Sequence, residues 1–394
     1  MSRFLACLAL LLAGAAAAPA QQRWTALPEP NGTAVALAVV VSTAPREGDS
    51  SGSALIPLAA RTLVESARDA LAFLGARATT ECAPAFVRFT LMAAPAHWQV
   101  AAEIFLEAIF QAPIADETME RARGALLRAA QIEAGSPVAG ARQALAEALF
   151  GSPAAGPTAC VAPEAWRAAT AAEVSALIHS RFLPSRATAA LVGPIDRARA
   201  DPVLRHALGD AAGPIVLPHP DLLAAPADLL REDESVTTWA ELAFPVIGAP
   251  DTDALGLLAF RLAEVLEPAP TRPDLFDAGI QVQRFGASAA LMAELVLAPG
   301  GAEAGVGRLR RTVEELAAAP LPGPAFDALL RRYRGARLLE LATPEARAAD
   351  AALELFFRGR YRAPAQRLGR LTADRLRRAA ASLEEPIVAI LGPR

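Results

Sequence analysis

The segment Gly48–Gly52 fits the pattern Gly-x-Ser-x-Gly, with Ser50 at its centre. In serine hydrolases this pattern forms a sharp turn directly after a strand and holds the serine at the first turn of a helix. Acids are plentiful, and histidines that could act as the base follow at His97, His179, His206 and His219. Here residues 43–47 separate the expected strand from the motif, and a solvated turn before a helix explains the same residues. We interpret the motif as a turn and keep a serine hydrolase that uses Ser50 as an alternative.

Metal and nucleotide chemistry have little support elsewhere in the sequence. No histidine stands at ligand spacing from another, so a zinc site would need several distant residues to converge. The glycines near residues 300–307 lack the lysine of a phosphate-binding loop and do not follow the Rossmann order. We therefore predict no catalytic residue, no metal ligand and no cofactor, and we leave the substrate-binding residues unassigned.

The composition predicts an ordered protein of two or three domains. The chain has 394 residues, of which 53% are hydrophobic and 20% are charged, whereas disorder requires low hydrophobicity and high net charge. The formal net charge is −4 and the basic residues are scattered. A nucleic-acid partner is not expected, because binding one requires a basic surface.

The first twenty residues have the order of a secretory signal. Residues 1–3 carry a charge, residues 4–18 are apolar, and Ala18-Pro19-Ala20 supplies small residues at a cleavage site. We expect cleavage after Ala20 and a location in the bacterial periplasm or outside the cell. No later apolar run reaches the roughly 20 residues of a membrane span, so we expect no membrane span.

Two cysteines, Cys82 and Cys160, follow the expected cleavage site. An oxidising compartment would permit them to pair. Two buried thiols explain them equally well, because the sequence does not show whether they are close.

Apolar periodicity places the elements that would have to position any site. Residues 33–42 form a β-branched apolar run, which predicts a buried strand, and residues 53–74 have helical periodicity that ends at Gly75. A second strand is expected at 84–93, and helices at 97–110, 116–133 and 138–150. In the second half we expect strands or extended segments at 236–244, 279–284 and 289–297, and helices at 251–265, 304–316, 324–341 and 344–357.

The two halves of the chain end alike. A helix capped by Thr170 precedes a strand at 187–192 that stops at Gly-Pro, and a helix capped by Thr372 precedes a strand at 387–391 that stops in the same way. Self-similarity of this kind predicts a tandem duplication of one α+β unit. The expected domains are a signal peptide (1–20), an N-terminal lobe (23–208), an aperiodic linker (209–230) and a C-terminal lobe (231–394).

The order of elements resembles the insulinase, pitrilysin and mitochondrial processing peptidase family. The features that carry the resemblance are a buried first strand, a loop with Arg46-Glu47, a Gly-x-Ala that opens a helix, a Phe-x-Pro before a strand that ends in Val-Gly, and the duplication. The resemblance covers nearly the whole mature chain. It implies two homologous α+β lobes, each a mixed β-sheet with helices packed on one face, as in the processing-peptidase-like metallohydrolase fold.

The family's zinc motif is missing from its expected place. Active members carry His-x-x-Glu-His on the helix after the first strand, because positions i and i+4 share one helix face and reach one metal. Here the corresponding positions are Leu55, Leu58 and Ala59, and none can bind zinc. Glu133 lies where the resemblance implies the third ligand, and alone it is better explained as a solvated residue near a helix end. The family's His-Pro-Tyr-Gly-like stretch corresponds to residues 152–156, which keep only the turn residues.

The resemblance implies a non-catalytic, peptidase-like subunit. In the region that would hold the substrate backbone, residues 272–279, Arg272 is retained but tyrosine is missing; Tyr333 and Tyr361 are interpreted as packing residues. Full proteolytic units of the family have four lobes around a chamber, so this chain is expected to pair with a zinc-bearing relative, or with itself, and to help bind a peptide. A stand-alone peptide-binding scaffold without a proteolytic role is the alternative.

Overall fold

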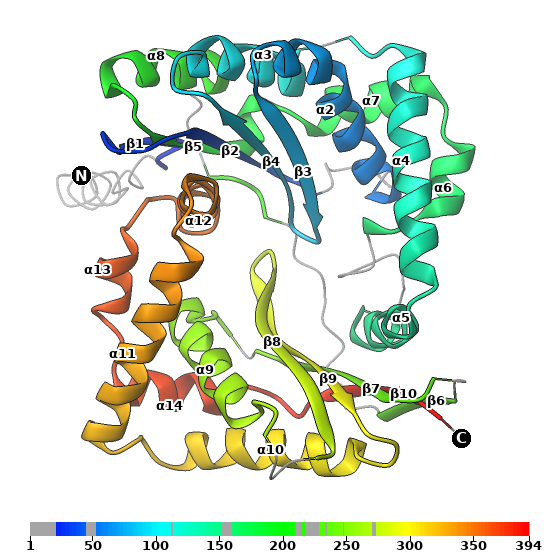
Figure 1. Cartoon of the computed structure of the whole chain (residues 1–394), viewed down its shortest axis with the longest axis vertical. Coiled ribbons are helices and arrows are strands. Elements are labelled where there is room, and N and C mark those ends of the chain that lie inside the picture. The colour runs from blue at the N-terminus through cyan, green and yellow to red at the C-terminus, as the bar shows by residue number, and fades with distance from the viewer. Residues whose placement is uncertain are drawn as a thin grey trace, which may run out of the picture.

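Two five-stranded β-sheets form the framework of the molecule, one in the upper and one in the lower half of Figure 1. The computed structural model describes residues 21–44, 53–111, 113–150, 160–209, 214–217, 228–232, 235–246, 248–269 and 273–393. The strand orders are β1-β5-β2-β4-β3 and β6-β10-β7-β9-β8. One edge pair in each sheet, β1–β5 and β6–β10, is parallel and the other pairs are antiparallel. The predicted α+β class with two mixed sheets is confirmed.

The first sheet is built around β2 (Val35–Ser42), whose eight residues are all buried. A continuous apolar run is typical of a strand that is covered on both faces. The other strands are β1 (Trp24–Pro28), β3 (Arg77–Ala83), β4 (Phe86–Ala93) and β5 (Ala187–Gly193). Alternate residues of β2 enter two different cores: Val35, Leu37, Val39 and Val41 on one face, and Ala36, Ala38 and Val40 on the other.

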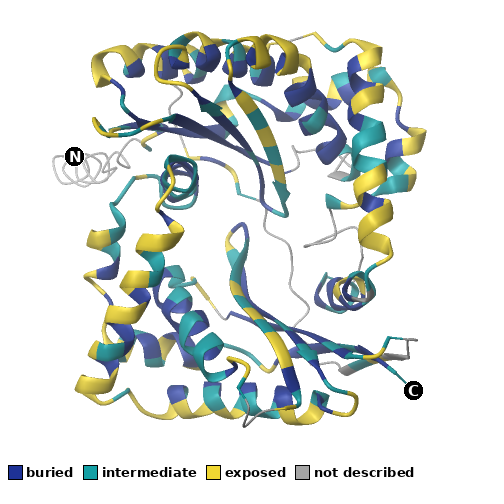
Figure 2. Cartoon of the chain, in the orientation of Figure 1, coloured by how far each residue is buried: buried dark blue, intermediate teal, exposed yellow. Residues whose placement is uncertain are grey.

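Helices of the N-terminal half cover the outer face of this sheet (Figures 1 and 2). They are α2 (Ile56–Phe73), α3 (Trp98–Phe110), α7 (Ala171–Arg181) and α8 (Arg197–Leu208). The predicted cap of α7 is confirmed, because the Thr170 hydroxyl accepts from the Glu173 amide and the Glu173 carboxylate accepts from the Thr170 amide. Gly75 follows α2 with φ +64°, a conformation that glycine adopts readily.

The second sheet repeats this arrangement around β7 (Thr238–Pro245). Its other strands are β6 (Asp228–Glu232), β8 (Leu275–Phe285), β9 (Ser288–Leu297) and β10 (Ile387–Gly392). Its outer face packs against α9 (Thr252–Val265), α10 (Ala302–Ala318), α11 (Gly323–Glu340) and α14 (Ala373–Ala381), with the short helix α13 (Pro364–Leu368) nearby. Tyr333 is buried in this core, as predicted, 5.4 Å from Phe260 between ring centroids.

Each sheet also receives one helix from the other half of the chain on its inner face. Helix α12 (Pro344–Arg358) packs on β2 and β5, and α5 (Pro137–Phe150) packs on β7 and β10. Alanines allow α12 to approach the sheet closely, since Ala348, Ala351 and Ala352 meet Ala36, Ala38 and Ala190 in one core. The two halves are therefore joined by packed helices as well as by the connecting chain.

Enlarging an alanine at this joint is expected to destabilise the whole molecule. Ala351 is fully buried, so Ala351→Leu should lower the free energy of unfolding by about 1–3 kcal/mol, because a packed core has no room for three extra carbons. Urea unfolding would measure the change. Ala318→Leu, at the exposed end of α10, is the matched control and should leave the midpoint unchanged; equal midpoints for both variants would contradict the close packing of α12.

Among the described elements, the sequence patterns did not predict three strands and three α-helices, one of which is the short helix α13. Strand β3 alternates between exposed and half-buried residues at a sheet edge, and β1 and β6 are five residues long, so none has a strong apolar signal. Helices α6 (Pro163–Ala168) and α8 were also not predicted. Strand β6 begins inside the predicted linker, and at 214–217 Ile215 is buried against the first half. The domain limits themselves stay a prediction.

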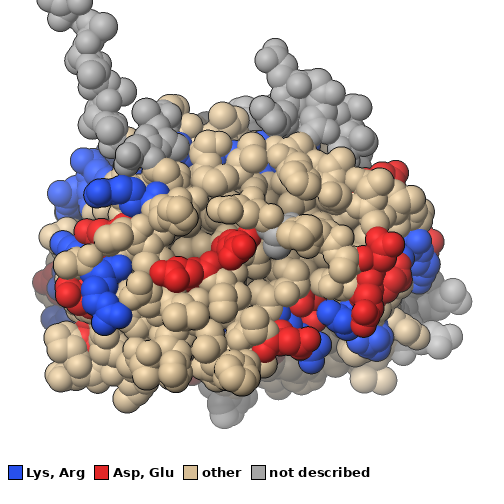
Figure 3. Space-filling view, turned by 90° about the horizontal axis from the view of Figure 1, so that it is seen from above, with Lys and Arg blue, Asp and Glu red and all other residues tan. Residues whose placement is uncertain are grey.

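The charged surface is mixed in sign. On the face seen in Figure 3, acidic and basic side chains are interspersed among a larger area of uncharged surface. Among the described residues, no helix is both long enough and apolar enough to cross a membrane. The expected signal peptide, 1–20, lies outside the described residues.

Candidate functional site

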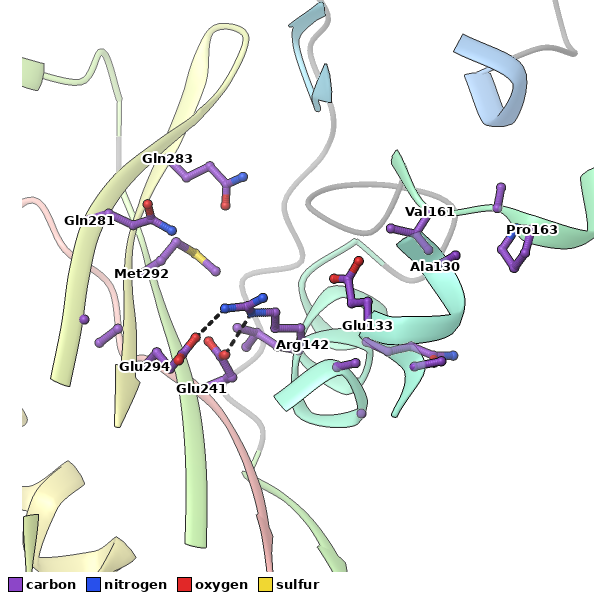
Figure 4. Close-up of a pocket in the computed structure, with 18 of the residues that line it drawn as sticks. Ala130, Glu133, Arg142, Val161, Pro163, Glu241, Gln281, Gln283, Met292 and Glu294 are labelled. Atoms are coloured by element: carbon purple, nitrogen blue, oxygen red, sulfur yellow. Dashed lines mark hydrogen bonds and ion pairs between the residues drawn. The ribbon is translucent and has the colours of Figure 1, made fainter. Parts of the chain in front are cut away.

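A cavity of about 1040 Å³ lies between the two halves of the molecule. Its walls come from α4 (Asp116–Ala134), α5, residues 161–163 and strands β7, β8 and β9. Figure 4 shows Gln281, Gln283 and Met292 on the second sheet, across from Glu133 and Val161 on the opposite wall. The lining is mixed, with apolar surface and a few amide and carboxyl groups, as is usual for ligand cavities.

Two glutamates and one arginine form the polar floor of this cavity. Glu241 on β7 and Glu294 on β9 are directly opposite in the antiparallel register, so their side chains share one face. Arg142 on α5 reaches both: its Nε donates to Glu241 Oε1 at 3.2 Å and its Nη2 donates to Glu294 Oε2 (Figure 4). One cation therefore serves two carboxyl groups that come from the other half of the chain.

Burial raises the pKa of Glu241 to about 8. The side chain is only 6% exposed, and a neighbouring carboxyl, Glu294, adds to the shift, while Arg142 opposes it. Desolvation and a like charge both disfavour the ionised form. At neutral pH the protonated form of Glu241 is therefore favoured.

A disulfide fixes one wall of the cavity to the first sheet. Cys82, on the edge strand β3, is joined to Cys160, with 5.9 Å between their Cα atoms. Residues 161–163, which line the cavity, follow Cys160 directly. Of the two possibilities left open by the sequence, the structure contains the paired one.

The positions where the resemblance implies a zinc motif lie at the start of α2, next to the cavity. Ala54, which precedes them, lines the cavity, and its carbonyl accepts a hydrogen bond from Trp166 Nε1 at 2.9 Å. Leu55 is half-buried, whereas Leu58 and Ala59 have no exposed surface and belong to the core under the first sheet. Among the residues that the structure describes, no group of three or more His, Cys, Asp or Glu side chains could hold a metal ion.

The remaining predicted positions are dispersed or undescribed. Glu133 is exposed near the end of α4 and lines the cavity, as an isolated carboxylate. His97 stands before α3, and His179 and His206 lie on α7 and α8. Tyr361 is half-buried against the inner core of the first sheet. Outside the described residues lie Ser50 with its motif, residues 152–156, His219 and Arg272.

Sequence reasoning missed the three residues on the cavity floor. Glu241 offered one signal, because it interrupts the otherwise apolar strand TWAELAFP. A carboxyl group in a buried strand requires a partner or a proton. Nothing in the spacing of Arg142 and Glu294 indicated that they would supply it.

Comparison with solved structures finds the same fold in several proteins. The inactive domain of a peptidase M16 from Pseudomonas fluorescens aligns with 95% of this chain and 96% of its own length, at 17% identity and a TM-score of 0.76. This chain has an M16-like fold. A chain of complex III from Candida albicans (11% identity, 95% of both chains, TM-score 0.74) and a protease from Helicobacter pylori (11% identity, 95% and 99%, TM-score 0.72) share the architecture.

No family model and no curated protein sequence matches the chain. At these identities the likeness establishes the fold alone. It supports the two-lobed, M16-like fold that the order of elements predicted.

Proposed function

We propose that this protein is a non-catalytic, exported subunit that binds an extended peptide between its two sheets and pairs with a zinc-bearing relative. The observation that carries the first part is the burial of Leu58 and Ala59 at the place of the zinc motif. Their side chains have no lone pair for a metal and point into a closed core. Hydrolysis therefore falls to a partner, while this chain contributes part of the chamber wall.

The cavity has features that suit a peptide main chain. Strand β8 is the outermost strand of the second sheet, so one row of its backbone groups can accept a further strand. Gln281 and Gln283 of β8 and Met292 of β9 line the cavity. Amide side chains can both donate and accept hydrogen bonds, and methionine adapts to different apolar side chains.

The partner and the location rest on the sequence. Residues 1–20 have the order of a signal peptide, which supports a location in the periplasm or outside the cell. The absence of a zinc motif from an otherwise peptidase-like order of elements motivates a zinc-bearing partner. A homodimer without proteolytic activity is the competing arrangement.

Affinity purification of the mature protein from its native periplasm tests the pairing. If a chain with His-x-x-Glu-His co-elutes and a chelator stops cleavage of an unstructured peptide by the eluate, the subunit role is supported. If the protein elutes alone and inert but still binds the peptide, it is a stand-alone scaffold. Cleavage that a chelator leaves unchanged and that Ser50→Ala abolishes would instead establish the serine hydrolase.

Filling the cavity should weaken peptide binding without harming the fold. A side chain added at Gly279, on β8, meets nothing within 4 Å, and the residue lines the cavity beside Glu294. We expect Gly279→Phe to weaken binding of an unstructured peptide at least about tenfold, because the ring would occupy the peptide's place. Fluorescence anisotropy would measure this affinity.

The matched control is Gly335→Phe. Gly335 lies on the exposed side of α11, away from the cavity, and also has open space around it. This variant should bind like the unmodified protein. Equal losses for both variants, or none for either, would mean that the peptide binds elsewhere.

A further inference from the structure

Helix α5 packs over Glu241 at the floor of the cavity and shields this side chain from water. It packs on β7 and β10, and Ala144, Leu145 and Leu149 share a core with Ala243 and Ala389 of the second sheet. Phe150, at its end, stacks edge-on with Phe285 at 5.0 Å between ring centroids. The same helix forms a wall of the cavity, so displacing it would open the cavity.

Among the described elements, only two place charged side chains next to Glu241. Strand β9 supplies Glu294, and α5 supplies Arg142. On its other side, β10 places Ala389 in register with Glu241 and adds no charge. Glu147, one turn further along α5, accepts from Gln143 Nε2 at 3.1 Å, and Glu133 stands on the opposite wall of the cavity.

Undocking of α5 must therefore change how tightly Glu241 holds its proton. With α5 docked, burial and Glu294 hold the pKa of Glu241 at about 8; in contact with water the carboxyl would return to its ordinary value of about 4.3. The docked state consequently binds one proton more than the undocked state at every pH between these values. By linkage, each pH unit in this range shifts the equilibrium about tenfold toward undocking.

We propose that Glu241, Glu294 and Arg142 form a proton-controlled latch that holds α5 on the second sheet and so regulates opening of the cavity. A protonated Glu241 donates to the Glu294 carboxylate, which Arg142 also contacts, and this neutral cluster keeps the helix docked. When Glu241 loses its proton, two carboxylates and only one guanidinium remain under the helix. Undocking lets water hydrate the carboxylates and so weakens their mutual repulsion. The value of this latch for peptide binding rests on the proposed function.

Amide hydrogen exchange of the full mature chain, measured without peptide from pH 5.5 to 9.5, tests the latch. Protection factors remove the intrinsic effect of pH on exchange, and local opening gives its own protection level. For amides of residues 138–150 we expect protection to fall by up to about tenfold per pH unit until about pH 8 and then to level off. Amides of α11, which is remote from Glu241, should change less.

Three variants should change the pH dependence of protection in α5 in different ways. Glu241→Gln should remove the pH dependence in α5. Glu294→Gln should move the levelling-off to lower pH, because a neighbouring carboxyl that raises the pKa of Glu241 is gone. Arg142→Met should move it to higher pH, because the opposing cation is gone.

Several outcomes would overturn the latch: no pH dependence in the unmodified protein, dependence that persists in Glu241→Gln, or equal dependence in α5 and α11, which would indicate global unfolding. Binding of an unstructured peptide, assayed separately at pH 6 and pH 9, examines the proposed function. If the protein shows the expected pH-dependent exchange but binds no peptide, the proposed function is wrong and the latch still stands.

Discussion

Leu58→Glu is expected to destabilise the protein severely instead of restoring part of a zinc site. Leu58 has no exposed surface and lies in the core between α2 and the first sheet. The change removes apolar burial of about 2 kcal/mol. It also forces a carboxyl with an ordinary pKa of about 4.3 to stay protonated at pH 7, which costs about 4 kcal/mol more. Such a sum, about 6 kcal/mol, equals the whole stability of many domains.

Urea unfolding at two pH values separates the two contributions. A buried glutamate has a raised pKa. The variant protein therefore keeps its stability at pH values below the ordinary pKa of the carboxyl and loses stability as pH rises. The loss should therefore be about 3 kcal/mol smaller at pH 5 than at pH 7. Leu55→His, at the half-buried position of the same motif, is the control and should cost about 1 kcal/mol or less. A Leu58→Glu variant with the urea midpoint of the unmodified protein would contradict the burial of this position.

Removal of the disulfide is expected to have the second-largest effect. Cys82 and Cys160 are 78 residues apart, and closing so long a loop restricts the unfolded chain strongly. The double variant Cys82→Ala, Cys160→Ala should lose about 2–5 kcal/mol of stability. Urea unfolding would measure the loss. Adding reductant to the unmodified protein should lower its urea midpoint as much as the double substitution does.

The double variant also provides its own control, because reductant should not change its midpoint. Since residues 161–163 line the cavity beside Cys160, hydrogen exchange should increase there before it increases in β2. If reductant left both the midpoint and the exchange of this wall unchanged, the bond would not tether the cavity.

Several elements could be predicted because their signals are local. The apolar run of β2 and the Thr170 cap of α7 depend on residues that are neighbours in the sequence, and both lie close to where the patterns placed them. Strand β3 could not be predicted in this way. It is an edge strand whose residues are exposed or half-buried, so its pairing with β4 decides its conformation more than its own side chains do.

The candidate site divides in the same way. The sequence was sufficient to place apolar residues where the resemblance implies a zinc motif, because that stretch lies within one helical segment, between Leu55 and Ala59. It could not predict the floor of the cavity. Arg142 is 99 residues from Glu241 and 152 from Glu294, and they meet only because α5 packs on the sheet of the other half.

The sequence by itself determined the α+β class and the order of most elements, and it placed apolar residues where the resemblance implies zinc ligands, since each is written in residue types at short spacing. Only the tertiary structure decided the exchange of α5 and α12 between the halves, the Cys82–Cys160 bond and the raised pKa of Glu241. These depend on burial and on contacts across long separations. A carboxyl group has an ordinary pKa in water and a raised one under a helix, and its place in the chain does not reveal which surroundings it will have.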